Sequence, residues 1–235
     1  MINRMAGQSA LRKLLATFIA CLVTLPAAAD TLIFGGTRGV GLETARLLVE
    51  QGEAVTVMVR STSDVSGLNE IDGVETVVGD AMEPESMATA FASREFNRAV
   101  STLSGKPEEG FAVDSVGKIN AIEAAKAAGV EHFVLVSSIG VGDSAGALPP
   151  PALKALAAVL AEKAKAEDYL VQSGVGFTVI RPGALTRKPA NGNGILSEDA
   201  SLGGIISRAE VARLVVESIN NAEAQGKIYS AIEQK

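Results

Sequence analysis

The chain has 235 residues, of which 47% are hydrophobic and 20% are charged, a composition typical of one globular domain. Three basic and no acidic side chains precede Asp30, so the remainder carries 18 basic against 27 acidic side chains, a net charge of −9, which disfavours a nucleic-acid partner. With one cysteine, Cys21, and one histidine, His132, we expect no disulfide framework, no metal site and no Ser-His-Asp catalysis.

The first 29 residues have the three-part layout of a secretory signal. Residues 1–13 carry the positive charges, residues 14–25 form an apolar run, and Pro-Ala-Ala-Ala at 26–29 supplies small residues before a cleavage site. The apolar run is shorter than the roughly 20 residues of a membrane-crossing helix. We therefore predict export, periplasmic or secreted, with cleavage after Ala29; the alternatives are an uncleaved membrane anchor and an organelle transit peptide.

From residue 30 onward, short apolar runs alternate with helical segments. Apolar runs without alternation, separated by helices, are typical of a parallel sheet covered on both faces. We therefore predict a single doubly wound α/β domain of three layers over residues 30–235, with ligands at the carboxyl ends of its strands. The predicted strands are 31–34, 54–59, 74–80, 98–104, 132–138, 176–183 and 227–232, and the predicted helices are 41–52, 84–93, a long one ending at Gly129, 151–172 and 208–220.

Two predicted loops are long. Residues 139–151 follow the fifth strand and residues 183–204 follow the sixth, and both exceed the usual connection of roughly 4 to 6 residues. Their place at the ligand-binding rim indicates a substrate mouth, and for the second loop plain disorder is the alternative. His132 stands where the fifth strand begins, which favours a structural role over catalysis.

A glycine pattern, G-x-x-x-G-x-G, joins the first strand to the first helix at Gly35, Gly39 and Gly41. Glycine permits a tight turn and lets backbone N–H groups approach a pyrophosphate at the positive end of the helix. At the end of the second strand an acid would bind the ribose 2′-hydroxyl of NAD. This chain has Arg60 there and Arg38 in the loop, so we predict NADP(H) over NAD(H); the alternative is that Arg60 is only a solvated strand end.

Seven motifs occur together between about residues 31 and 232: FGGTRGVGLETARLL, VMVRS, VVGDAMEPESM, FVLVSSIG, KAKAEDYL, GFTVIRPG and ISRAEVARLVVESI. In combination they resemble the atypical short-chain dehydrogenase/reductases of the NAD(P)H-binding, NmrA-like group. The resemblance implies a Rossmann fold that binds NADP(H). The binding residues that it implies are Gly35, Thr37, Arg38, Gly39, Val40, Gly41 and Arg60, with Asp80 and Ala81 beside the adenine, Leu103 and Ser104 lining the cleft, and Pro182 near the nicotinamide.

The chain departs from the tyrosine-dependent members of that superfamily. Those enzymes use Tyr-x-x-x-Lys, in which the lysine lowers the tyrosine pKa and holds the ribose. The lysine position resembles Lys163, but Val159 stands four residues earlier. Neither Tyr169 nor Tyr229 completes the spacing, so the sequence leaves the proton donor open.

Two side chains are candidates for catalysis, Lys163 and Ser138. Lys163 shares a helical stripe with apolar residues while Lys165 points away, so Lys163 is predicted to face the sheet and contact the ribose. The alternatives are an ion pair with Glu167 or a stem that carries the amine to solvent. Ser138 ends the fifth strand and is predicted to touch substrate or nicotinamide, with simple capping of the strand end as the alternative. The apolar stripe consists of Leu153, Leu156, Leu160 and Leu170.

Two functions are consistent with these residues. The first is an NADPH-dependent oxidoreductase or isomerase of a small carbonyl-like substrate, in which the cofactor supplies hydride and Ser138 or a water supplies the proton. The second is an NADP(H)-binding redox sensor or assembly factor that docks on another protein without turnover. The missing tyrosine supports the second, since a fold does not imply catalysis.

Overall fold

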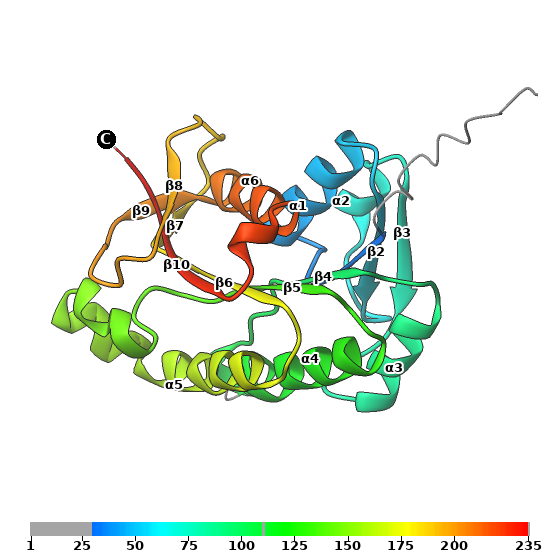
Figure 1. Ribbon diagram of the computed structural model, residues 1–235, viewed down its shortest axis with the longest axis horizontal. Coiled ribbons are helices and arrows are strands. Elements are labelled where there is room, and N and C mark those ends of the chain that lie inside the picture. Colours follow the sequence, from blue (N-terminus) through cyan, green and yellow to red (C-terminus); the bar gives the residue numbers. More distant parts are fainter. Residues whose placement is uncertain (1–29, 110, 235) are drawn as a thin grey trace, which may run out of the picture.

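The computed structural model describes residues 30–109 and 111–234, and the predicted leader lies outside this range. The described chain forms an eight-stranded sheet with helices on both faces (Figure 1). The three-layer, doubly wound α/β fold predicted from the sequence is therefore confirmed. Among the described helices, none combines the length and the apolar character needed to cross a membrane.

Seven of the strands in the sheet are those predicted from the sequence, and the order of strands is β3-β2-β1-β4-β5-β6-β10-β8. Strand β1 pairs in parallel with both β2 and β4. The strand order reverses at this place, and the crevice at such a reversal is where doubly wound folds bind ligands. The seven strands are β1 (Asp30–Phe34), β2 (Ala54–Val59), β3 (Val74–Val78), β4 (Arg98–Ser101), β5 (His132–Val136), β6 (Phe177–Pro182) and β10 (Lys227–Glu233).

The helices divide between the two faces of the sheet (Figure 1). Helices α1 (Gly39–Glu50) and α6 (Arg208–Ile219) cover one face, where Leu48 and Val215 belong to the buried core. Helices α3 (Pro84–Ala92), α4 (Lys118–Ala127) and α5 (Pro150–Gln172) cover the other, with Phe91, Ile122 and Leu170 in a second core. The short α2 (Ser66–Asn69) follows β2. Prolines at the first turns of α3 and α5 suit a position whose N–H has no partner within the helix.

The rim segment between β6 and α6 is built differently from the prediction. Residues 183–204, predicted as a long loop, contain β7 (Ala184–Thr186) and β8 (Gly194–Ser197), and β9 (Ile205–Ser207) follows. Strand β8 pairs antiparallel with β10, while β7 pairs with β9 in a separate two-stranded sheet. Disorder, the alternative for this segment, is wrong. Strands of three or four residues are too short to show a period of two, so these three were not predictable from the sequence.

Several short helical turns complete the chain. The loop after β5 contains a 3₁₀ turn, η3 (Gly142–Ala147), and two others are η1 (Pro107–Glu109) and η4 (Ala222–Ala224). Helix α4 is preceded by a π-helical turn, η2 (Val113–Gly117). Such turns occur mostly as single-turn insertions and often at functional sites. This turn places Asp114 in the interior, where it becomes part of the candidate site.

The predicted apolar stripe of α5 is buried only in part. Leu160 and Leu170 are buried, but Leu156 is 39% exposed. The prediction that the whole stripe faces the sheet is therefore wrong for the first turns of the helix, whose residues 154–158 are exposed. Lys163 lies in the buried part, as predicted, and Lys165 is exposed on the opposite side.

Candidate functional site

The predicted cofactor residues lie where successive strands end. Because β1 to β6 are parallel, their carboxyl ends meet at one edge of the sheet, and this edge contains the reversal of strand order. The structure therefore brings the predicted residues to one rim. Gly35 follows β1, Arg60 follows β2, Asp80 and Ala81 follow β3, Leu103 and Ser104 follow β4, Ser138 follows β5, and Pro182 ends β6.

The glycine loop has the conformation that its glycines predict. Gly35 and Gly39 have φ angles of 83° and 58°, in the left-handed region that favours glycine. A Cβ atom on Gly41 would lie 2.5 Å from the carbonyl oxygen of Gly35 and 2.6 Å from Thr102 Oγ1, so only glycine lets α1 pack this closely. Thr102, to which no sequence motif points, donates from Oγ1 to the Gly35 carbonyl at 3.0 Å and fixes the loop to the end of β4.

The start of α1 is suited to a phosphate group. The N–H groups in the first turn of a helix lack partners within it, and the Arg38 side chain, just before this helix, makes no capping hydrogen bond. The first turn contains no acidic residue, so the partial positive charge of the helix end is not offset there. Together with the glycine loop, these features fit the pyrophosphate of a dinucleotide. Thr37 is partly exposed, whereas the Val40 side chain is buried in the core.

Two arginines lie in the segments next to the start of α1. Arg38 in the loop and Arg60 after β2 are both exposed. Within the described part of the chain, neither has a carboxylate within ion-pair distance. The backbone N–H of Arg60 donates to Ser63 Oγ at 3.1 Å, which holds the turn after β2. This edge of the molecule therefore presents positive charge without an internal counter-charge.

Lys163 belongs to a buried cluster of three ionisable side chains. Its Nζ donates to Asp114 Oδ1 at 2.6 Å, and Lys118 Nζ lies 3.5 Å from the same oxygen. Lys118 is fully buried and donates to the carbonyl of Val136 at 3.3 Å. The other carboxylate oxygen of Asp114 accepts from the Gly105 N–H at 2.7 Å. Asp114 thus joins α5, the π turn before α4 and the loop that follows β4.

The cluster contains one carboxylate and two amines, so the carboxylate can balance the charge of only one amine. Burial lowers the pKa of Lys118 well below its usual value, repulsion from Lys163 lowers it further, and attraction to Asp114 opposes both. Lys163 lies closer to the carboxylate and is 8% exposed. We infer that Asp114 and Lys163 form the ion pair, while Lys118 is the amine that burial drives toward its neutral form.

The alternative partner considered for Lys163 is wrong. The Glu167 carboxylate instead accepts from the Arg181 guanidinium, with Nη2 at 2.7 Å, and from the Ser137 hydroxyl. Lys163 pairs with Asp114, which comes from a turn far away in the sequence. No spacing rule within one helix predicts such a partner. Contact of Lys163 with a ribose stays a prediction.

Ser138 and Pro182 lie together on the rim. Ser138 is partly exposed, and its Oγ donates to the carbonyl of Ile139 at 2.9 Å. The N–H of Ile139 in turn donates to the Pro182 carbonyl at 3.0 Å. This places the hydroxyl beside the end of β6, and its role stays a prediction.

The predicted adenine residues differ in exposure. Ala81 is buried, and its carbonyl accepts from Asn120 Nδ2 at 2.9 Å. Asp80 Oδ1 accepts from the N–H of Met82 at 2.9 Å, which shapes the turn after β3. In the segment after β4, Leu103 is partly buried and Ser104 is exposed.

Features at the opposite rim do not belong to this site. His132 is 3% exposed at the start of β5, the predicted place, with Nε2 2.9 Å from Thr178 Oγ1. A hollow of about 710 Å³ lies near the same rim, lined in part by Phe91, Arg94 and Gly129. Within residues 30–109 and 111–234 there is no group of three or more His, Cys, Asp or Glu residues able to hold a metal.

Comparisons with known proteins agree with this architecture. Residues 35–222 match the NAD(P)H-binding family. An uncharacterised chloroplast protein of Arabidopsis thaliana is 32% identical over 214 residues, 85% of this chain and 75% of that protein. Sanguinarine reductase of Eschscholzia californica is 37% identical over 124 residues, 50% of this chain and 44% of that protein. This chain therefore spans less than half of the second relative.

Among solved structures, the anaerobillin reductase ChuY of Escherichia coli O157:H7 is 30% identical, with a TM-score of 0.78 over 88% of this chain and 98% of that one. The family match begins at Gly35 in the glycine loop and ends at Ala222 after α6, so it includes all of the described helices from α1 to α6 and excludes strands β1 and β10. The chain belongs to the NAD(P)H-binding family and is an atypical short-chain dehydrogenase/reductase with a Rossmann fold.

Proposed function

We propose that the protein is an NADPH-dependent oxidoreductase or isomerase of a small carbonyl-like substrate. The observation that carries this proposal is the glycine loop at the start of α1 with Arg38 and Arg60 exposed beside it. NADPH differs from NADH by a 2′-phosphate, and guanidinium groups bind phosphate through charge-assisted hydrogen bonds. An arginine in place of an acid after β2 favours the phosphorylated cofactor.

The relatives support reductase chemistry. ChuY is named an anaerobillin reductase, and the relative from Eschscholzia californica is named a sanguinarine reductase. Both names describe reduction of an organic substrate, which is the chemistry that a bound nicotinamide supplies as hydride. From these relatives we extend only the reaction class, reduction, to this chain. The small carbonyl-like substrate is part of our own proposal.

In this proposal the residues of the rim have distinct roles. Lys163, oriented by its ion pair with Asp114, holds the ribose of the cofactor. The Ser138 hydroxyl, or a water beside it, gives a proton to the substrate oxygen as hydride reaches the neighbouring carbon. The remaining contacts are Gly35, Thr37, Arg38, Gly39, Val40 and Gly41 at the phosphates, Arg60 at the 2′-phosphate, Asp80 and Ala81 at the adenine, Leu103 and Ser104 along the cleft, and Pro182 near the nicotinamide.

A second candidate function is an NADP(H)-binding sensor or assembly factor without turnover. Val159 stands four residues before Lys163, where the tyrosine-dependent enzymes have their tyrosine. A chain without that proton donor can bind the cofactor without turning it over. This observation favours a protein that responds to the cofactor and transmits its state to a protein partner.

One experiment tests the reductase and separates it from the sensor. NADPH oxidation is followed over a panel of aldehydes, ketones and quinones for the wild type, Ser138→Ala, Lys163→Met and the control Lys165→Met, whose lysine is exposed. We expect the first two variants to lose about 10²-fold or more in kcat/KM and the control to match the wild type. Equal rates in all four proteins contradict the residue roles. NADPH binding without turnover of any substrate supports the sensor.

A separate proposal concerns the N-terminal leader. We propose that residues 1–29 direct the protein to a compartment and are removed. The chloroplast location in the name of the Arabidopsis thaliana relative supports the organelle transit peptide over export. Mass spectrometry of the protein from its native cells tests removal: a mature chain that starts near Asp30 is expected, and one that starts at Met1 contradicts it.

A further inference from the structure

Arg208, the first residue of α6, lies against the glycine loop. A Cβ atom placed on Gly39 would be 3.4 Å from Arg208 Cδ and 3.6 Å from its Nε. One end of the guanidinium, Nη1, donates to the carbonyl of Thr186 at 3.0 Å. The half-buried side chain therefore extends from the end of β7 to the loop in which we place the pyrophosphate.

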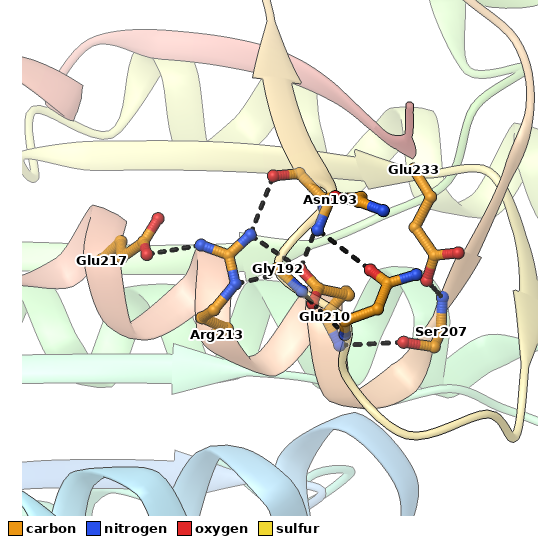
Figure 2. Close-up of polar contacts among 9 residues, drawn as sticks. Gly192, Asn193, Ser207, Glu210, Arg213, Glu217 and Glu233 are labelled. Atoms are coloured by element: carbon orange, nitrogen blue, oxygen red, sulfur yellow. Dashed lines mark hydrogen bonds and ion pairs between the residues drawn. The ribbon is translucent and has the colours of Figure 1, made fainter. Parts of the chain in front are cut away.

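The backbone at the start of α6 is held from several directions (Figure 2). Ser207 Oγ accepts from the Glu210 N–H at 3.1 Å, and the Ser207 N–H donates to Glu233 Oε1 at 2.8 Å. The buried Glu210 carboxylate also accepts the backbone N–H groups of Asn191, Gly192 and Gly194. Because its neighbours on both sides are fixed, Arg208 reaches the glycine loop from a rigid base.

The surroundings of Arg208 lack a counter-charge. Of the nine arginines in the described chain, five form ion pairs. The other four are Arg38, Arg60, Arg187 and Arg208, and all of them except Arg187 lie at or next to the glycine loop or the end of β2. Within the described residues, Nε and Nη2 of Arg208 also have no hydrogen-bond acceptor. In a chain of net charge −6, unpaired arginines gathered at one place indicate an anion site.

We propose that Arg208 is a cofactor-binding residue whose guanidinium binds the pyrophosphate, and that this contact joins the rim segment 184–207 to the bound cofactor. The inference rests on the proposed binding of NAD(P)H. Arg208 lies at Gly39, where the loop enters α1, which is the phosphate-binding end of that helix. Arg60 follows β2, at the place where this fold recognises the 2′ position of the adenosine ribose. The two arginines therefore bind different phosphates.

Equilibrium titrations of the full chain with four ligands test this assignment. NADPH carries both phosphate groups, NADH and ADP-ribose carry only the pyrophosphate, and 2′-AMP carries only the 2′-phosphate. Arg208→Met is expected to weaken the binding of NADPH, NADH and ADP-ribose by the same factor, about tenfold or more. The affinity for 2′-AMP is expected to stay unchanged. Arg208→Lys keeps the positive charge and is expected to lose less affinity for these three ligands than Arg208→Met. The matched control is Arg187→Met, which removes another unpaired arginine near β7.

The outcomes separate this inference from the proposed function. If the wild type binds NADPH and Arg208→Met binds the pyrophosphate ligands equally well, Arg208 is not a cofactor residue and the proposed function is unaffected. A loss restricted to NADPH and 2′-AMP also overturns the assignment, because it places Arg208 at the 2′-phosphate. If the wild type binds none of the four ligands, the proposed function fails and this inference fails with it. Thermal unfolding of each variant shows whether a loss of affinity results from unfolding of the protein or from the loss of the arginine contact.

Discussion

At the residue scale, the least expected feature is a carboxylate shared by two buried amines. Asp114 pairs with Lys163 at 2.6 Å, while Lys118 is 3.5 Å from the same oxygen and fully buried. A buried lysine without a full counter-charge costs free energy in its protonated form. The cluster therefore makes the stability of the protein depend on pH through Lys118.

Lys118→Met is expected to stabilise the protein at pH 7. The pKa of Lys118 is lowered in the folded state by burial and by Lys163, so the unfolded chain binds more protons between the folded value and the usual value of about 10.4. The contribution of Lys118 is thus most favourable above that usual value and falls as pH decreases. Urea unfolding is expected to give the variant an advantage of about 1 kcal/mol or more at pH 7, and a smaller one at pH 9.5.

The control for this prediction is Lys126→Met, which removes an exposed lysine from the same helix. It is expected to change the free energy of unfolding by less than about 0.5 kcal/mol at both pH values. An effect of Lys118→Met that is the same at pH 7 and pH 9.5 would show that this amine keeps its proton in the folded protein.

The conformation and burial of single residues were predictable from the sequence where they depend on residues nearby in the chain. The left-handed conformations of Gly35 and Gly39 follow from the glycine pattern, and the burial of Lys163 follows from helical periodicity. Asp114 and Arg208 were missed because their partners, Lys163 and Gly39, are distant in the sequence. An acid within a helical pattern gives no sign of which lysine it will meet.

At the element scale, the rim segment between β6 and α6 depends on one side chain. The Glu210 carboxylate accepts N–H groups from Asn191 at 2.7 Å and Gly194 at 3.0 Å, and is bridged by Arg213 at 2.7 Å (Figure 2). Burial raises the pKa of Glu210, but hydrogen bonds from Arg213 and from the N–H groups of Gly192 and Asn191 outweigh it, so the pKa is lowered. The ionised carboxylate is therefore the form that holds this segment.

Glu210→Gln is expected to destabilise the protein by about 1.5–3 kcal/mol at pH 7, as is usual for hydrogen bonds to a charged group. Because the folded pKa of Glu210 is lowered, its contribution is present above the unfolded value of about 4.3 and is lost as pH falls through the folded value. The difference between wild type and variant, measured by urea unfolding, is thus expected to shrink between pH 7 and pH 3.5.

A matched control is Glu217→Gln, since Glu217 bridges the same Arg213 but is 57% exposed. Exposed ion pairs contribute about 1 kcal/mol or less, so this variant is expected to stay close to the wild type. Equal stability of Glu210→Gln and the wild type at pH 7 would mean that the carboxylate does not hold the segment.

Elements with strong patterns were predicted, and short ones were not. Seven strands and the helices that separate them follow from apolar runs and helical periodicity. Strands β7, β8 and β9 were missed, because their pairing with each other and with β10, and not their sequence, defines them. The exposed Leu156 was placed on the buried stripe because periodicity gives a face but does not show how far along the helix the sheet extends.

At the scale of the whole molecule, the strand order explains why distant motifs form one site. The glycine loop after β1 and the cleft residues after β4 become neighbours because β1 pairs with β4. Arg60 and Asp80 join them because β2 and β3 extend the sheet on the other side of β1. The fold class and the gathering of the predicted residues at one rim were therefore predictable from the sequence, while the contacts among Asp114, Lys118 and Lys163 required the structure.

The most direct test of the account is a fluorescence titration of NADPH and NADH into the purified protein and into Arg60→Glu. We predict micromolar binding of NADPH, weaker binding of NADH, and a loss of about tenfold or more for NADPH alone in the variant, because a carboxylate would repel the 2′-phosphate. Binding of neither nucleotide to the wild type would contradict the account and would mean that the glycine loop no longer serves a cofactor.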